Sequence, residues 1–153
     1  MNAKQNLRIH TTYADGKDRP EELIFEALAR GFDSIGFSEH TYLPYSSYPN
    51  QLTVDKMARY RQEIADLKVK YQGKINIFCG LEYDFYSEVD TEGFDYLIGS
   101  VHYLDCSGEI VTFDHSYVVP MVVGKLISGL CAVTLPLLIY RGDPQTSKTA
   151  VET

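Results

Sequence analysis

Five side chains that commonly bind metal ions stand at or just beyond the ends of short apolar segments. None of the five is a neighbour of another in the sequence, and together they offer three imidazoles and two carboxylates. This mixture of nitrogen and oxygen donors suits borderline divalent ions such as Zn, Mn or Fe. The candidate metal ligands are His10, Asp15, His40, Glu82 and His102.

Each candidate has a simpler explanation when it is taken alone. Asp15 precedes Gly16, and Asp-Gly is a common turn pair. A single histidine at a strand end is more often a hydrogen-bonded structural residue than a ligand. Glu82 is harder to explain in this way, because it ends an otherwise apolar strand and an unpaired buried carboxylate is costly. The recurrence of such residues at four successive strand ends therefore favours a metal site.

The chain alternates apolar segments with helical patterns, which is the order typical of an α/β fold. Apolar residues at helical spacing predict one helix that opens at Pro20 and ends near Gly31, and a second over 54–71. Strands of nearly continuous apolar character between helices indicate a parallel sheet covered on both faces. All carboxyl ends of such strands lie at one edge, so the five candidates should converge there. The four predicted strands are 7–11, 34–39, 75–82 and 96–103.

Other residues near the candidates have less specific roles. Glu39 and Tyr42 flank His40 and are candidate hydrogen-bond partners of the ligands, although Glu39 could equally be a solvated charge. His115 follows no clear strand, which favours a surface or loop histidine. The cysteines show no C-x-x-C spacing, which indicates reduced thiols that act as small apolar fillers. They are Cys79, Cys106 and Cys131.

The composition is that of an acidic globular protein with a single domain. Hydrophobic residues make up 44% of the 153 residues, and the formal net charge is -7. This charge disfavours binding to nucleic acid or anionic membranes, but a small phosphorylated substrate is compatible with bound metal ions. The N-terminus carries no apolar signal segment, and the apolar run 126–140 is too short for a membrane span and contains Pro136. We therefore expect a cytoplasmic protein.

Four ordered motifs resemble those of a known family. They read R-I-H-T-T-Y-A-D-G, G-F-S-E-H, G-L-E-Y-D and F-D-Y-L-I-G-S-V-H-Y. Over about residues 6–116 they resemble the polymerase and histidinol phosphatase (PHP) superfamily, and the last three are most similar to its histidinol-phosphate phosphatase branch. The resemblance implies a distorted seven-stranded β/α barrel with up to three metal ions, and hydrolysis of L-histidinol phosphate in histidine biosynthesis. By position it implies the same five ligands, with Glu82 bridging two ions.

The reaction implied by the resemblance needs no protein nucleophile. A metal-bound hydroxide is expected to attack the phosphoryl group, since a divalent ion lowers the pKa of water towards neutral. No serine lies in a G-x-S-x-G setting. Two alternatives remain open: another PHP-type phosphoesterase or nuclease, and a non-catalytic fragment or pseudo-enzyme that binds metal weakly.

The first motif departs from the family pattern. The family has D-x-H-x-H at this point, whereas this chain has Asn6 and Arg8 before His10. A guanidinium stays charged and cannot bind a metal ion. The departure therefore predicts fewer ions than in complete relatives, as few as one per chain. Arg8 could instead contact a substrate phosphate.

A second departure concerns length. A β/α barrel takes about 250 residues, and the residues after Tyr103 are too few for three more strands with their helices. We therefore expect an incomplete (β/α)7-type distorted TIM-like barrel with about four parallel strands. Residues 1–117 would form the N-terminal part of the domain. The atypical tail 118–153 is interpreted as truncated or frame-shifted, the alternative being a divergent C-terminal helix.

Two consequences follow from an incomplete barrel. The strand predicted at 96–103 would keep an open edge, and unpaired edges promote self-association. Hydrolysis of L-histidinol phosphate by this chain as written would be negligible, because later loops of the barrel would have to hold the substrate and Arg8 stands in a ligand position.

Overall fold

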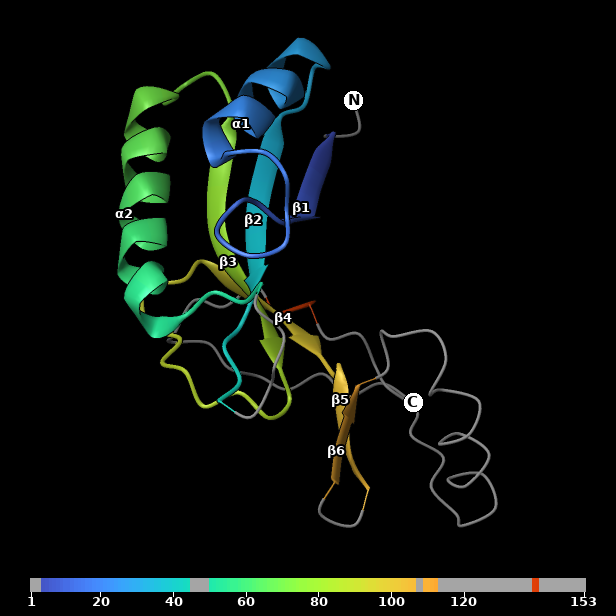
Figure 1. The fold of residues 1–153 in the computed structure, drawn as a ribbon. Helices are drawn as coiled ribbons and strands as arrows, with labels where there is room; N and C mark the ends of the chain where they lie inside the picture. The colour runs from blue at the N-terminus through green and yellow to red at the C-terminus, as the bar shows by residue number, and fades with distance from the viewer. Residues whose placement is uncertain (1–3, 45–49, 107–108, 113–138, 141–153) are drawn as a thin grey trace.

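A computed structural model describes residues 4–44, 50–106, 109–112 and 139–140 of the chain (Figure 1). Strands and helices alternate up to residue 84, as the sequence predicts, and a fourth strand follows without a helix before it. A hairpin and a short strand follow. The elements are β1 (Gln5–Ile9), α1 (Pro20–Ala29), β2 (Ser34–His40), α2 (Val54–Lys70), β3 (Asn76–Asp84), β4 (Tyr96–Ser100), β5 (Tyr103–Cys106), β6 (Glu109–Thr112) and β7 (Ile139–Tyr140).

The main sheet has the strand order β1-β2-β3-β4-β7, and its first four strands are parallel. Strands that are adjacent in the chain are therefore adjacent in the sheet, and the four curl into part of a barrel (Figure 1). The predicted α/β fold with four parallel strands of an incomplete barrel is confirmed. All four carboxyl ends point to the same edge, which is where the candidate ligands lie.

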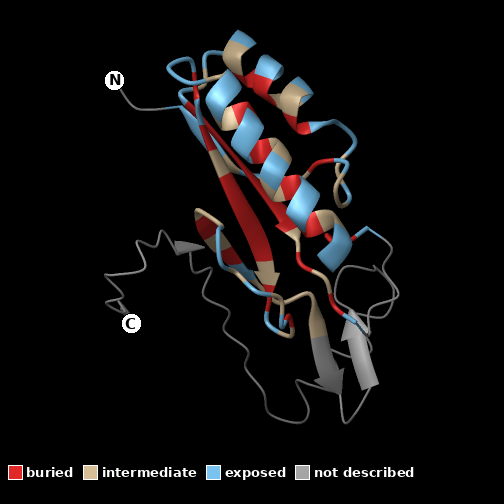
Figure 2. Cartoon of the chain, turned by 90° about the vertical axis from the view of Figure 1, so that its left-hand side faces the viewer, coloured by how far each residue is buried: buried red, intermediate tan, exposed pale blue. Residues whose placement is uncertain are grey.

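Both helices pack on one face of the sheet, and buried residues fill the space between them (Figure 2). Alternate residues of the strands point to this face, as the two-residue period of a strand requires. The same spacing leaves Gly36, Ser38 and His40 of β2 on the opposite face. The core residues are Ile24 and Ala27 of α1, Met57, Tyr60, Ile64 and Leu67 of α2, Ile35 and Phe37 of β2, Ile77, Cys79 and Leu81 of β3, and Leu52 and Ile75 of the connecting segments.

The helix boundaries follow the sequence signals closely. Pro20 is the first residue of α1, where its missing N–H costs nothing, and the Glu22 carboxylate accepts a hydrogen bond from the Arg19 backbone N–H at 2.8 Å. Gly31 follows the helix with a φ of 70°, and Gly73 follows α2 with a φ of 77°. Both glycines therefore adopt the left-handed conformation that ends a helix.

Tyr96 of β4 covers the face of the sheet that is turned away from the helices. Its hydroxyl donates to the carbonyls of Leu7 at 2.5 Å and Phe37 at 3.0 Å, so one side chain joins β1, β2 and β4. A Cβ atom at Gly36 would lie 2.5 Å from this hydroxyl, and one at Gly80 would lie 2.3 Å from the ring. Glycine is therefore required at both positions, directly below the edge that carries the candidate ligands.

The prediction of a single strand over 96–103 is wrong. β4 ends at Ser100, Val101 and His102 lie outside the sheet, and β5 begins a separate antiparallel hairpin with β6. The cause is Asp84, whose carboxylate accepts hydrogen bonds from both the backbone N–H and the ring of His102. These bonds draw the chain out of the sheet before the hairpin starts.

The edge of β4 is also less open than the sequence predicts. β7 pairs antiparallel with β4 through Leu97↔Tyr140 and Ile98↔Ile139. The end of the apolar run 126–140 thus covers two residues of that edge, whereas 126–138 and His115 lie outside the described residues. Neither α1 nor α2, the helices that the structure describes, is long and apolar enough to cross a bilayer.

Candidate metal centre

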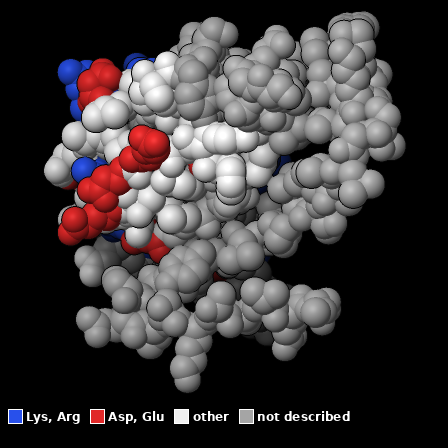
Figure 3. Space-filling model, turned by 90° about the horizontal axis from the view of Figure 1, so that it is seen from below, with Lys and Arg blue, Asp and Glu red and all other residues white. Residues whose placement is uncertain are grey.

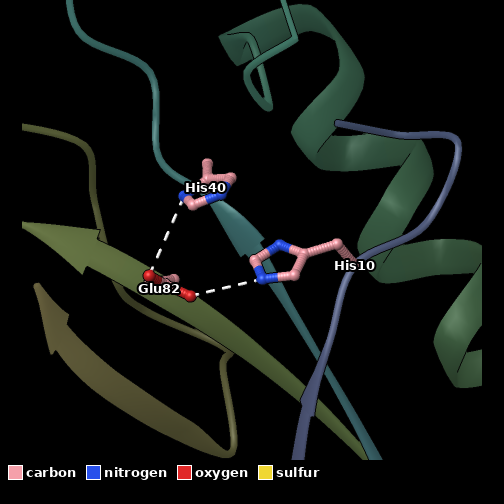
Figure 4. Close-up of side chains that lie close together, drawn as sticks. All are labelled: His10, His40 and Glu82. Carbon is pink, nitrogen blue, oxygen red and sulfur yellow. Dashed lines mark ion pairs between the residues drawn. The ribbon is translucent and has the colours of Figure 1, made fainter. Parts of the chain in front are cut away.

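Three of the five predicted ligands meet at the carboxyl edge of the sheet (Figure 4). His10 follows β1, His40 ends β2 and Glu82 lies near the end of β3. One ligand atom from each of these residues lies within 4.8 Å of the others. His40 and Glu82 are register partners in neighbouring parallel strands, and both side chains stand on the face away from the helices. The strand register therefore fixes their separation.

Asp15 completes the outer side of this cluster. Its two carboxylate oxygens each lie 3.5 Å from an imidazole nitrogen, one from His10 Nδ1 and the other from His40 Nε2. The loop after β1 folds back tightly, since the Gly16 N–H donates to the Thr11 carbonyl at 2.9 Å and a Cβ at Gly16 would lie 2.2 Å from the His10 carbonyl. The Asp15-Gly16 pair therefore makes a turn and delivers a carboxylate to the two histidines.

His102 approaches Glu82 from the opposite side. Its Nε2 lies 3.1 Å from Glu82 Oε1, and its Nδ1 lies 3.1 Å from Asp84 Oδ2. Asp84 is 2% exposed, and its other oxygen accepts from the Tyr86 N–H at 2.9 Å. Sequence reasoning missed Asp84, although a second acidic residue two positions after Glu82 in the same strand was an available signal.

Hydrogen bonds to Asp84 hold the ring of His102 beside Glu82. Burial acts to raise the pKa of Asp84, but hydrogen bonds from His102 and from the Tyr86 backbone hold this pKa below its ordinary value. The ionised Asp84 is an acceptor, so His102 Nδ1 carries the proton that it donates. His102 Nε2 lies 3.1 Å from Glu82 Oε1, close enough for the two groups to bind the same ion.

Glu82 is the electrostatic centre of the cluster. It is 3% exposed, and burial alone would raise its pKa. The nitrogens of His10, His102 and Arg8 outweigh burial and hold the pKa of Glu82 far below its ordinary value, so the group is a carboxylate. The pKa of His40 is lowered, first by burial and then by the neighbouring His10, which favours the neutral imidazole that binds metal.

Two groups in the cluster lack the partners that buried polar atoms normally have. Among the described residues, neither ring nitrogen of His10 has a hydrogen-bond partner, and neither does Glu82 Oε2. His10 Nε2 lies 3.3 Å from Glu82 Oε2. These nitrogen and oxygen atoms face one another without hydrogen-bond partners. A divalent ion of the Zn, Mn or Fe type could bind to both and so satisfy them. The residues present therefore fit a metal ion.

Glu39 supports the site from the helix-covered face. It is completely buried, and one carboxylate oxygen accepts from the Thr11 hydroxyl at 2.6 Å and from the Thr11 N–H at 3.0 Å. Burial raises the pKa of Glu39 to about 7. The contact fixes the chain directly after His10. The Tyr42 carbonyl accepts a hydrogen bond from Ser87 Oγ at 3.3 Å.

Arg8 stands beside the same cluster. One guanidinium nitrogen lies 2.9 Å from Glu82 Oε1, although the Arg8 side chain is 58% exposed. β1 has an irregular register between Asn6 and Ile9, and the Arg8 backbone N–H donates to Asn6 Oδ1 at 3.1 Å. Seen from the edge to which the strands point, acidic groups gather on the left of the described surface (Figure 3). Arg8 therefore brings a permanent positive charge to the buried Glu82 carboxylate.

The fold and the arrangement of this edge define a class of protein. A model of the PHP domain matches residues 6–134, and the chain belongs to this family. It is 35% identical over 130 residues to the histidinol-phosphatase of Bacillus subtilis, a match that covers 73% of this chain and 48% of the relative. The chain spans about half the length of the curated relatives it matches.

Two solved structures are similar to this chain. Histidinol phosphate phosphatase from Lactococcus lactis, solved with Zn, L-histidinol and phosphate, has a TM-score of 0.56 and 28% identity. That match covers 69% of this chain and 41% of the Lactococcus protein. The proposed histidinol phosphatase hisK of Listeria monocytogenes has a TM-score of 0.63 at 19% identity, covering 74% of this chain and 50% of the other, and supports the fold.

Proposed function

We propose that this chain carries the metal site of a histidinol phosphatase, which hydrolyses the phosphomonoester L-histidinol phosphate to L-histidinol and phosphate. The observation that carries the proposal is the convergence of His10, His40 and Glu82 within 4.8 Å at the carboxyl edge. The names of the similar proteins support the substrate.

In this proposal five side chains hold divalent ions of the Zn, Mn or Fe type. Such ions supply a Lewis acid that lowers the pKa of water and offsets the negative charge that develops on the phosphoryl oxygens. Asp84 fixes the orientation of one imidazole, and Glu39 fixes the loop after β1 through Thr11. The five ligands are His10, Asp15, His40, Glu82 and His102.

The expected partner is a small phosphorylated molecule rather than nucleic acid. An acidic chain with a net charge of -7 would repel a polyanion, whereas a single phosphate can be held by the bound cations. A second candidate function is a non-catalytic metal-binding chain. The specific observation that favours it is Arg8, because its guanidinium already contacts Glu82 Oε1 at 2.9 Å.

The test is phosphate release from L-histidinol phosphate by the 153-residue chain with added Mn²⁺ or Zn²⁺ and with EDTA. We expect very little release, all of it metal-dependent, because Arg8 opposes metal binding at Glu82. The variant Glu82→Gln should abolish release, since an amide of the same shape carries no charge. Glu26→Gln is the matched control, because Glu26 is an exposed residue of α1.

Three outcomes separate the candidates. Metal-dependent release that Glu82→Gln removes and Glu26→Gln leaves intact supports the phosphatase. Metal binding without any release supports the non-catalytic candidate. Release that is insensitive to EDTA or to Glu82→Gln would overturn the proposed site.

A further inference from the structure

The two oxygens of Glu82 have different surroundings. Oε1 lies 2.9 Å from the Arg8 guanidinium and 3.1 Å from His102 Nε2. Oε2 lies 3.3 Å from His10 Nε2 and has no hydrogen-bond partner among the described residues. One side of this carboxylate is therefore already neutralised by the protein, whereas the other side is still unsatisfied.

Arg8 can leave Glu82 more easily than the other neighbours can. The Arg8 side chain is 58% exposed, whereas His10 and His102 are 17% and 18% exposed and are held by the sheet edge and by Asp84. A long side chain that is largely exposed can move its charged end from a buried partner into water. Glu82 itself is 3% exposed and stays in place. The pair thus joins a fixed buried anion to a movable cation.

We propose that Arg8 and a divalent metal ion compete for Glu82. The guanidinium is the resident counter-ion in the metal-free chain, and it must withdraw from Oε1, at least in part, when a metal ion binds. This proposal rests on the metal site of the proposed function and adds a residue that lowers its affinity. It gives Arg8 two opposite effects: stabilisation of the metal-free fold and weakening of metal binding.

Charge alone decides the direction of both effects. Without metal, loss of Arg8 leaves a buried carboxylate with one cationic partner fewer, which destabilises the fold. With metal, loss of Arg8 removes a positive charge from the vicinity of a dication and frees an oxygen for it, which strengthens binding. A purely structural arginine would produce the first effect without the second. An arginine that serves only to contact phosphate would produce neither.

The test compares Arg8→Met and Arg8→Lys with the unmodified chain. Zn²⁺ affinity is measured by competition with a chromogenic chelator, and Tm is measured in EDTA and in saturating Zn²⁺. Arg8→Met should bind Zn²⁺ at least about tenfold more tightly, and its Tm in EDTA should fall on the order of 5 °C. Arg8→Lys keeps the charge and should change both values less. Arg30→Met is the control, since Arg30 pairs with Glu26 on α1.

Each result decides the proposal. Tighter Zn²⁺ binding by Arg8→Met, with Arg30→Met unchanged, supports competition. Equal Zn²⁺ affinity in the unmodified chain, Arg8→Met and Arg8→Lys overturns competition and leaves the metal site standing. Absence of Zn²⁺ binding in every variant overturns the metal site itself, and the competition with it. If Arg8→Met fails to fold, the neutral variant Arg8→Gln replaces it. Tighter Zn²⁺ binding by Arg8→Gln than by Arg8→Lys then supports competition, and equal affinity overturns it.

Discussion

The body of the sheet and its carboxyl edge are made from the same strands but serve different purposes. In β3, Leu81 points to the helices and is completely buried in the apolar core, whereas the next residue, Glu82, points to the cluster of histidines. In β2 the apolar Phe37 lies three residues before His40. A strand can therefore supply packing along its length and ligands at its end, so stability and metal binding should respond to different substitutions.

The largest expected effect tests the body of the sheet. Leu81→Ala should reduce the free energy of unfolding by about 2–5 kcal/mol, because it leaves a cavity in a fully packed core. Zn²⁺ affinity of the molecules that remain folded should change less than about threefold, well within one kcal/mol. Urea unfolding and chelator competition measure the two quantities. Val69→Ala is the control, since Val69 is 75% exposed. A large loss of affinity in Leu81→Ala would show that the two regions are not separate.

Asp84→Asn tests the boundary between the two regions, and its effect should be next in size. Oδ2 accepts two hydrogen bonds from His102 and Oδ1 accepts one from Tyr86, whereas an amide has a single acceptor oxygen. The variant should lose about 1–3 kcal/mol of stability, the cost of an unpaired buried donor. Zn²⁺ affinity should fall about 10–100-fold, as when a metal-bound histidine loses its carboxylate partner.

The control for Asp84→Asn is Asp66→Asn, a matched change at an exposed residue of α2. Addition of Zn²⁺ should raise the Tm of the control as much as it raises that of the unmodified chain. If Asp84→Asn loses stability but keeps its full Zn²⁺ affinity, Asp84 belongs to the body of the sheet and His102 needs no orientation for metal binding.

Asp15→Asn should affect metal binding while leaving stability almost unchanged. The Asp15 side chain is 31% exposed, and its oxygens lie 3.5 Å from the two imidazoles, beyond good hydrogen-bond geometry. We expect a change in stability within about 0.5 kcal/mol in EDTA and a loss of Zn²⁺ affinity of about tenfold or more. Asp18→Asn, at an exposed position of the same loop, should change neither. A stability loss as large as that of Asp84→Asn would remove the contrast between the two carboxylates.

The sequence predicts the strand ends better than it predicts the contacts between them. Apolar segments, Pro20 and Gly31 mark elements through local preferences, and parallel strands then require their ends to meet. The bend at His102 depends on Asp84, which lies 18 positions earlier, and the Arg8–Glu82 pair joins residues 74 positions apart. Neither contact leaves a periodic pattern in the sequence, since each arises only when the sheet has formed. The hairpin β5–β6 is missed for a different reason, because the apolar pattern assigns Tyr103 to the strand predicted at 96–103.

The smallest expected effect concerns Cys79, which lies in the body of the sheet only three residues before Glu82. It is 3% exposed and packs in the core, and burial raises the pKa of its thiol to about 12. The thiolate that reacts with iodoacetamide is then about 10⁻⁴ of the total at pH 8. In a background of Cys106→Ser and Cys131→Ser, alkylation of the native chain should be far slower than in urea. The native chain should be alkylated at nearly the same rate in EDTA and in Zn²⁺, because the metal ion would bind at the carboxyl edge and not in the core. A native rate that Zn²⁺ suppresses strongly would mean that opening of the edge also opens the core, and the comparison between the two regions would fail.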